Sequence, residues 1–267
     1  MKLWVLSDNN TLIDRYFLGE PAVSYYIEAD GLRILFDTGY SDVFWKNAQA
    51  LGLSLNGLSH IVLSHGHNDH TGGLALLAQE RELTHVQLVC HPRCLLPRWY
   101  EADEIGLPES GAILSLCQYR PSAQPLFLSK NCVFLGEIPV SHSFEQRRPL
   151  GRVLLDGTQQ PDLLLDDSAL AIRTGEGLFI VTGCSHSGIC NIVSYACAVC
   201  GDSRVAGIIG GFHLPRVNSR VEKTAEFLAS LHPGPLYPCH CVSLAAKCRL
   251  MRSLDVREVG SGMCIQL

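Results

Sequence analysis

The sequence predicts one domain of mixed α and β structure. Short apolar runs typical of buried strands alternate with segments that carry helix signals. The chain has 267 residues, 47% of them hydrophobic, which is enough to build a substantial core. No repeat, low-complexity tract or linker interrupts the pattern. We therefore predict a single domain over residues 1–267.

The order of elements begins with a strand and a hairpin. A strand is expected at residues 3–6, and Asp30-Gly31 is a turn signal between strand patterns at residues 24–28 and 32–36. The remaining strands are predicted at residues 61–64, 86–90, 132–135, 163–172, 178–182, 205–209 and 236–238. Helices are predicted at residues 42–51, 73–81, 189–200, 218–231 and 243–253.

Two segments carry no clear strand or helix pattern. Residues 93–131 hold four prolines, and residues 141–162 are polar. A long irregular segment inside a compact domain is usually functional or disordered. We predict residues 93–131 to be an irregular insertion that could act as a lid, and residues 141–162 to be a loop.

The composition bears on the classes of partner. The net charge is −5 and no long Lys/Arg cluster occurs, so we expect no nucleic-acid partner, because phosphate neutralisation supplies most of that affinity. The one basic pair, Arg147-Arg148, is either part of a solvated loop or a binding site for a substrate phosphate. No apolar run approaches the roughly 18 residues that span a membrane, so we expect no membrane partner.

The N-terminus and the cysteines bear on the compartment. Residues 1–8 lack the long apolar region and cleavage site of a secretory signal, so we expect a cytoplasmic protein. The 12 cysteines are expected to be reduced thiols in such a chain. The sequence leaves the oligomeric state open, a homo-oligomer included.

The stretch from His65 to His70 places three imidazoles and one carboxylate within six residues. Clustered imidazoles repel one another when protonated and need partners when buried, and a divalent cation removes both difficulties. His65 and His67 are spaced to close on one ion, while Asp69 and His70 point elsewhere. The stretch predicts a metal site for one ion or two, against the alternative of a polar loop rich in histidine.

Further ligand-type side chains follow the ends of other predicted strands. Cys184 and His186 follow one strand, and His213 and His240 each follow another. Strand ends at one edge of a sheet converge, so we expect these side chains to share the site. Asp37, at the end of an earlier strand, is predicted either to cap backbone groups or to support a metal ligand from behind.

These motifs resemble a known family. His65-x-His67-x-Asp69-His70, preceded by Asp37-Thr38-Gly39, is similar to the pattern of the metallo-β-lactamase superfamily. The resemblance implies an α+β fold, the αββα sandwich, with two facing mixed β-sheets, helices outside and metals at one edge. Later motifs resemble the branch named after 7,8-dihydropterin-6-methyl-ribofuranosylaminobenzene 5′-phosphate synthase. They are Gly183-Cys184-Ser185-His186-Ser187-Gly188, Gly210-Gly211-Phe212-His213-Leu214 and Pro238-Cys239-His240-Cys241.

Carried over residue by residue, the resemblance assigns His65 and His67 to a first metal, and Asp69 and His70 to a second. His240 stands where the superfamily has its last metal histidine. After Cys239-His240-Cys241 the branch pattern has Thr-Gly, whereas this chain has Val242-Ser243. The departure leaves the metal ligands in place and concerns the substrate contacts.

The sequence does not decide which residues between positions 167 and 186 are metal ligands. Many superfamily hydrolases have a histidine before the penultimate hairpin and a bridging aspartate after it, whereas this chain has Asp167 before it and Cys184 after it. We expect His186 to be a metal ligand. Cys184 is expected to be a soft ligand or bridge, or else a buried thiol, and Asp167 to be a ligand or the support of one.

The remaining roles concern protons and the identity of the metal. Asp69 and His213 are candidates for moving protons, and His213 alternatively contacts substrate or is a hydrogen-bonded structural histidine. The expected cofactor is a divalent metal, as one or two ions. We expect Zn first, with Mn or Fe as alternatives, because His and Asp ligands accept each of them.

Three functions are compatible with the sequence. The leading hypothesis is a metal-dependent enzyme acting on a small, phosphorylated or pterin-like substrate, as a hydrolase or as the transferase that the branch implies. The second is a generic metallo-hydrolase of a small ester, lactone or phosphodiester. The third, suggested by the many cysteines, is a metal- or redox-responsive binding protein without turnover.

Overall fold

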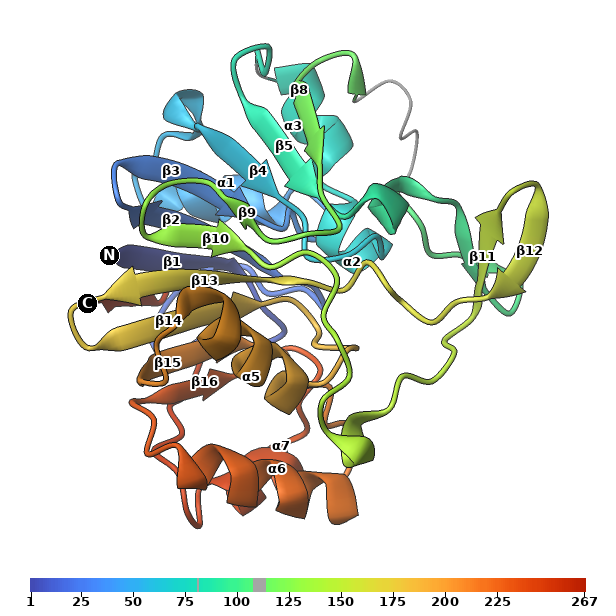
Figure 1. Ribbon diagram of the computed structural model, residues 1–267. Coiled ribbons are helices and arrows are strands. Elements are labelled where there is room, and N and C mark those ends of the chain that lie inside the picture. Colours follow the sequence, from blue (N-terminus) through green and yellow to red (C-terminus); the bar gives the residue numbers. More distant parts are fainter. Residues whose placement is uncertain (81, 108–113) are drawn as a thin grey trace.

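The computed structural model describes residues 1–80, 82–107 and 114–267. Within these residues the strands form three sheets. The first two lie face to face, with helices on their outer sides, and the third projects to one side (Figure 1). The first sheet has the order β17 (Cys264–Gln266), β1 (Lys2–Ser7), β2 (Ser24–Ala29), β3 (Leu32–Phe36), β4 (His60–Val62), β5 (Gln87–Cys90), β8 (Gln118–Pro121).

The other two sheets are built mainly from the second half of the chain. The second sheet has the order β16 (Leu236–Pro238), β15 (Val205–Gly210), β14 (Gly177–Thr182), β13 (Ala169–Thr174), β10 (Cys132–Phe134), β9 (Leu126–Phe127). The third has the order β12 (Thr158–Pro161), β11 (Arg152–Leu155), β6 (Arg98–Tyr100), β7 (Asp103–Glu104). The helices are α1 (Val43–Ala50), α2 (Asn68–Thr71), α3 (Leu74–Glu80), α5 (Ile189–Cys200), α6 (Ser219–Ser230), α7 (Leu244–Leu250), η1 (Leu55–Gly57), η2 (Pro92–Leu95) and η3 (Ser143–Glu145).

Three apolar clusters separate the layers. One lies between the two main sheets and includes Phe36 and Phe134. The second joins the first sheet to α1 and α3 and includes Phe44, and the third joins the second sheet to α5, α6 and α7. Burying both faces of each sheet in this way produces four layers. The predicted αββα sandwich is confirmed.

The parallel strands bring their carboxyl ends to one edge. In the first sheet β3, β4 and β5 are parallel neighbours, and in the second β14, β15 and β16 are parallel neighbours. The carboxyl ends of parallel strands meet at one edge of a sheet, where ligands bind. The segments that follow these strands carry the candidate site residues.

Two segments that the sequence predicts to be irregular contain short strands. Residues 93–131 contain β6 to β9, of which β8 and β9 extend the two main sheets, and residues 141–162 contain the β11–β12 hairpin. These strands are short and mostly solvent-exposed, so no apolar alternation marks them in the sequence. The lid role of residues 93–131 stays a prediction; residues 108–113 lie outside the described part, as does residue 81, the predicted end of a helix.

Three other expectations can be compared with the structure. Nowhere in the described ranges is a helix long and apolar enough to cross a membrane. All twelve cysteines lie in the described part of the chain, where none of them forms a disulfide; the reduced state of the thiols stays a prediction. The description of residues 1–267 as a single domain stays a prediction.

Candidate metal centre

Three histidines from two loops form the first group of ligand-type atoms. His65 and His67 follow β4, and His186 follows β14; one nitrogen of each lies within 4.8 Å of the others. The ring centroids of His65 and His67 are 4.6 Å apart. Nε2 of His67 and Nε2 of His186 are buried and have no hydrogen-bond partner among the described residues. Because buried ring nitrogens normally have partners, this group fits a cation.

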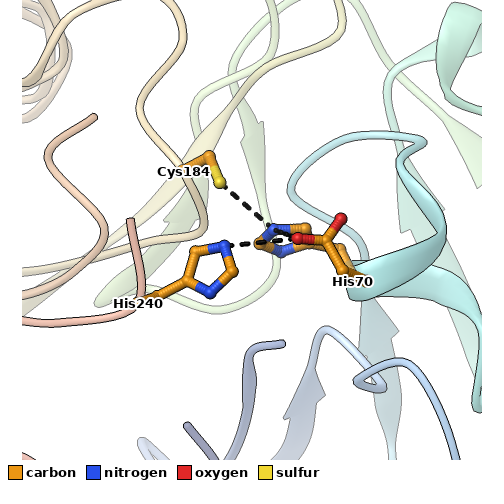
Figure 2. A group of neighbouring side chains, drawn as sticks. His70, Cys184 and His240 are labelled. Carbon is orange, nitrogen blue, oxygen red and sulfur yellow. Dashed lines mark hydrogen bonds and ion pairs between the residues drawn. The ribbon is translucent and has the colours of Figure 1, made fainter. Parts of the chain in front are cut away.

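The second group combines Asp69, His70, Cys184 and His240, whose ligand atoms also lie within 4.8 Å of one another. Asp69 Oδ2 is 3.5 Å from His70 Nε2 and 3.3 Å from His240 Nε2. The Cys184 Sγ is 3.3 Å from His70 Nε2. Figure 2 shows Cys184, His70 and His240 pointing toward one another from separate segments. Carboxylate, imidazole and thiolate are the ligands that Zn²⁺ accepts.

A third group shares Cys184 and adds His213 and Cys241. The His213 ring lies 4.5 Å from the His186 ring between centroids, and its Nδ1 has no hydrogen-bond partner within the described residues. The three groups therefore form one continuous cluster. Every residue that the sequence analysis named as a ligand, except Asp167, belongs to one of these groups, and the role of these residues as ligands stays a prediction.

The backbone of the histidine loop is fixed by a buried charge network. The Gly66 N–H donates to Asp166 Oδ2 at 2.8 Å, and Arg98 Nη2 lies 2.7 Å from Asp166 Oδ1. Arg98 also donates to Asp162 at 2.7 Å, and its side chain is 1% exposed. A Cβ at Gly66 would lie 1.9 Å from the Cys94 carbonyl oxygen. Only glycine fits at this position, because the backbone of the loop lies directly against the Cys94 carbonyl and the Arg98 side chain.

Asp37 lies behind the second group. It follows β3, accepts the N–H of Ser64 at 2.7 Å and the Ser64 hydroxyl at 2.7 Å, and lies 2.7 Å from His70 Nδ1. This carboxylate therefore holds both the start of the histidine loop and the ring of one candidate ligand. Of its two predicted roles, the geometry favours support of a ligand, which such partners orient.

His240 is oriented in a comparable way by the segment after β1. Asn9 Oδ1 lies 3.0 Å from His240 Nδ1, and Asp8 Oδ2 accepts the His240 backbone N–H at 3.1 Å. His240, His213 and Asp37 all have positive φ, at 54°, 49° and 55°. Left-handed backbone at non-glycine residues is unfavourable and clusters at functional sites. The surrounding structure therefore holds these three residues in a left-handed backbone conformation, which sets the direction of their side chains.

Asp167 lies outside the three groups. Its Oδ2 accepts the backbone N–H of Ser187 at 2.8 Å and also the Ser187 hydroxyl. It thereby fixes the turn that carries His186. The geometry favours the supporting role over the ligand role that the sequence left open.

Burial and neighbouring charges set the protonation of the cluster. Burial and the surrounding histidines lower the pKa of His65 and of His186 well below the usual value, and burial lowers the pKa of His67 to about 4. His70 differs: burial opposes protonation, but Asp69 and Asp37 raise its pKa well above the usual value. Although burial acts in the other direction, His70 and His240 lower the pKa of Asp69. The first group is thus neutral at neutral pH and keeps lone pairs available for a cation.

Sequence reasoning missed several residues of this site. Arg98 lies 64 residues before Asp162 and farther still from Asp166, and no motif marks the arginine. Asn9 has no signal either. Cys241 was visible inside a recognised motif and could have been added as a candidate ligand.

Comparisons with known proteins decide the family. The model of the metallo-beta-lactamase superfamily matches residues 18–240. The chain belongs to this superfamily. It is 29% identical to the 7,8-dihydropterin-6-methyl-4-(beta-D-ribofuranosyl)-aminobenzene-5′-phosphate synthase of Methanocaldococcus jannaschii, across 100% of this chain and 96% of that protein. It is 28% identical to the uncharacterised protein MJ0448 of the same organism, across 92% of each chain.

Solved structures agree with the superfamily. Tm1679, described as a metal-dependent hydrolase of the beta-lactamase superfamily, superimposes with a TM-score of 0.87 and 28% identity, over 100% of this chain and 99% of that chain. A diphosphatase of the PhnP family superimposes with a TM-score of 0.53 and 15% identity, over 100% of this chain and 97% of that chain, and so shows the fold alone. The superfamily and the donor set of the cluster both imply divalent metal.

Proposed function

We propose that the chain is a metal-dependent enzyme that acts on a small, phosphorylated or pterin-like substrate through a two-ion site. The observation that carries the proposal is the division of the cluster into two groups of ligand atoms. One comprises His65, His67 and His186, and the other Asp69, His70, Cys184 and His240. Structural zinc sites are usually closed and isolated, whereas two adjoining groups of this kind suit an open pair of ions. We take Zn as the first candidate, with Mn or Fe as alternatives.

A divalent cation held here would supply Lewis acidity to water and to substrate oxygens. Asp69 is the partly open carboxylate of the second group, with 28% of its side chain exposed. Held in the ionised form by His70 and His240, it can accept a proton from an attacking group. His213 carries an unpartnered Nδ1 beside His186 and can donate a proton to a leaving group.

The synthase relative supports a transferase role on a phosphorylated, pterin-containing product. A second candidate, hydrolysis of a small ester, lactone or phosphodiester, is supported by the description of Tm1679 as a metal-dependent hydrolase. The two differ in the fate of the substrate. Transfer joins two molecules and releases diphosphate, whereas hydrolysis consumes water alone.

The test compares the two reactions in protein loaded with Zn, Mn or Fe. One assay supplies a dihydropterin diphosphate and an aminobenzene ribotide and measures diphosphate release; the other supplies bis(p-nitrophenyl) phosphate or a simple ester. We expect turnover in one of them, and loss of metal loading and activity in His67→Ala and His70→Ala. Metal content that does not change in either variant would contradict the proposal. Tight metal binding without turnover would instead favour a binding protein.

A further inference from the structure

We propose that a surface cavity at the start of α6 binds the phosphate group of the substrate through Arg148, Arg220 and Lys223. The inference rests on the proposed function and narrows its substrate to a phosphate-bearing small molecule. The cavity lies between the segment around η3 and the start of α6 and has a volume of about 440 Å³. That volume is ample for a phosphoryl group and part of the molecule that carries it.

The lining of the cavity is strongly cationic. Two arginines and one lysine face it, and none of its lining residues in the described part of the chain is acidic. The whole chain, by contrast, has a net charge of −5. A concentration of positive charge on an acidic protein marks a place that attracts anions. Arginine and lysine are the side chains that bind phosphate oxygens through charge-assisted hydrogen bonds.

Arg148 and Lys223 form no ion pair among the described residues. Arg148 is exposed and has no hydrogen-bond or ion-pair partner among the described residues, whereas the adjacent Arg147 is occupied by the carbonyl oxygens of Ile138 and Leu164. Lys223 Nζ lies 5.7 Å from the centre of the Phe144 ring. Of the basic pair in the sequence, only the second residue is therefore available to a substrate.

Arg220 supplies the inner wall. Its Nε and Nη2 are buried and make no hydrogen bond within the described residues. One carboxylate faces it: Glu145 Oε1 lies 4.0 Å from Nη2. A single acid cannot balance three cations, so the cavity keeps a net positive charge. Unpaired guanidinium nitrogens are costly to bury, and a phosphate in the cavity would place an anion beside this guanidinium.

The cavity is connected to the metal centre through hydrogen bonds and along the chain. Glu145, behind Arg220, accepts the backbone N–H of Asn191 at 2.9 Å. Asn191 in turn donates to the carbonyl oxygen of Ser187 at 2.7 Å, and Ser187 directly follows His186. On the other side, the loop that carries His213 continues to Asn218, which lines the cavity. We infer from these two connections that the phosphate of a substrate held at the cluster reaches the cavity.

The first arm of the test measures the binding of phenyl phosphate to the metal-loaded protein by calorimetry at low ionic strength. The double variant Arg148→Gln/Lys223→Gln removes two cations from the cavity and leaves the metal ligands intact. We expect its affinity to fall about tenfold or more, because two charge-assisted contacts are lost. Arg220→Gln is expected to weaken binding in the same direction.

The matched control is Lys46→Gln/Arg204→Gln, which removes the same charge from two exposed positions elsewhere. Its affinity for phenyl phosphate should stay within about twofold of the unmodified protein, as expected for distant screened charges. Equal weakening in both double variants, or no change in the cavity variant, would overturn the proposal. This outcome does not depend on whether any reaction is catalysed, so it is distinct from failure of the proposed function.

The second arm distinguishes the phosphate of a substrate from free phosphate. With the substrate pair that the unmodified enzyme turns over, the cavity variant should show a raised KM for the phosphate-bearing compound. Its KM for an analogue of that compound without the phosphate group should not change, and neither should its metal content. The cavity variant could instead lose phenyl phosphate binding while its KM for the phosphate-bearing substrate stays the same. That result would show that the cavity binds free phosphate and would overturn its role in substrate binding.

Discussion

Asp37 Oδ2 lies 2.7 Å from His70 Nδ1, and both side chains are completely buried. The contact directs the other ring nitrogen, Nε2, toward Asp69 and Cys184. A carboxylate on the far nitrogen of a metal-binding histidine fixes the orientation of the ring and raises its basicity. The first sheet therefore orients the second group of candidate ligands through Asp37, a residue that belongs to none of the three groups.

Asp37→Asn should weaken the binding of one of the two ions by about 10- to 100-fold, because the amide keeps the shape of the side chain but loses its charge. Competition against a metal buffer measures the affinity. Asp42→Asn, which removes an exposed carboxylate paired with Lys46, is the matched control and should bind metal like the unmodified protein. Equal affinities in the two variants would contradict the role given to Asp37.

Arg98→Met should destabilise the protein by about 3–5 kcal/mol, because it leaves Asp162 and Asp166 as buried carboxylates without their cation. The free energy of unfolding in urea measures the effect. Arg204→Met is the control, since Arg204 is 62% exposed and pairs with Asp202 at the surface; its loss should be much smaller, because exposed ion pairs contribute little to stability. Equal losses in the two variants would mean that the arginine network does not hold the histidine loop.

Cys184→Ser distinguishes a thiolate ligand from a buried thiol. A ligand role predicts that one ion, in the group of Asp69, His70 and His240, binds more weakly, while the ion held by His65, His67 and His186 is kept. Cobalt-substituted protein should also lose its thiolate charge-transfer absorption. The control is Cys190→Ser, a buried thiol of α5 outside the three groups, whose spectrum should not change. An unaltered cobalt spectrum in Cys184→Ser would assign the thiol to packing alone.

The metal-free protein should lose stability on acidification. The pKa of His67 is about 4 in the folded chain and about 6.5 when unfolded. The unfolded chain therefore binds a proton below pH 6.5 that the folded chain does not, and the free energy of unfolding falls as the pH drops from about 6.5 to 4. One such histidine contributes a loss of about 3 kcal/mol. His65 and His186 act in the same direction, and His70 in the opposite one.

Urea unfolding at pH 7 and pH 4.5 measures this loss. His67→Gln should lose less free energy over the interval than the unmodified protein, because glutamine does not titrate. The comparison is made without metal in both proteins. Losses of equal size in the two would show that His67 is not the group that resists protonation.

The sequence predicted the parts of the fold that carry strong local patterns. The hairpin at residues 24–36 and the helix at residues 189–200 match β2, β3 and α5, because their apolar residues are buried on defined faces. The β11–β12 hairpin was missed, since all residues of β12 are exposed and no alternation shows them. The local sequence pattern therefore predicted the buried elements correctly but did not predict the exposed strands of the third sheet.

The same contrast holds at the site. The candidate ligands were visible because histidines and a cysteine follow strands at one edge, where the structure brings them together. Their supports were invisible or ambiguous. Arg98 meets Asp166 only through the tertiary fold, and the choice between Asp167 as ligand or support depends on a hydrogen bond to Ser187 that no spacing in the sequence reveals.

The measurement that tests the central claim most directly is the metal content of purified protein by elemental analysis after loading and desalting. We expect two equivalents of divalent metal in the unmodified chain and none in His67→Ala/His70→Ala. We also expect two equivalents in the control His85→Ala/His232→Ala, which removes two exposed histidines outside the cluster. No bound metal in the unmodified chain, or full metal content in the His67→Ala/His70→Ala variant, would contradict the claim.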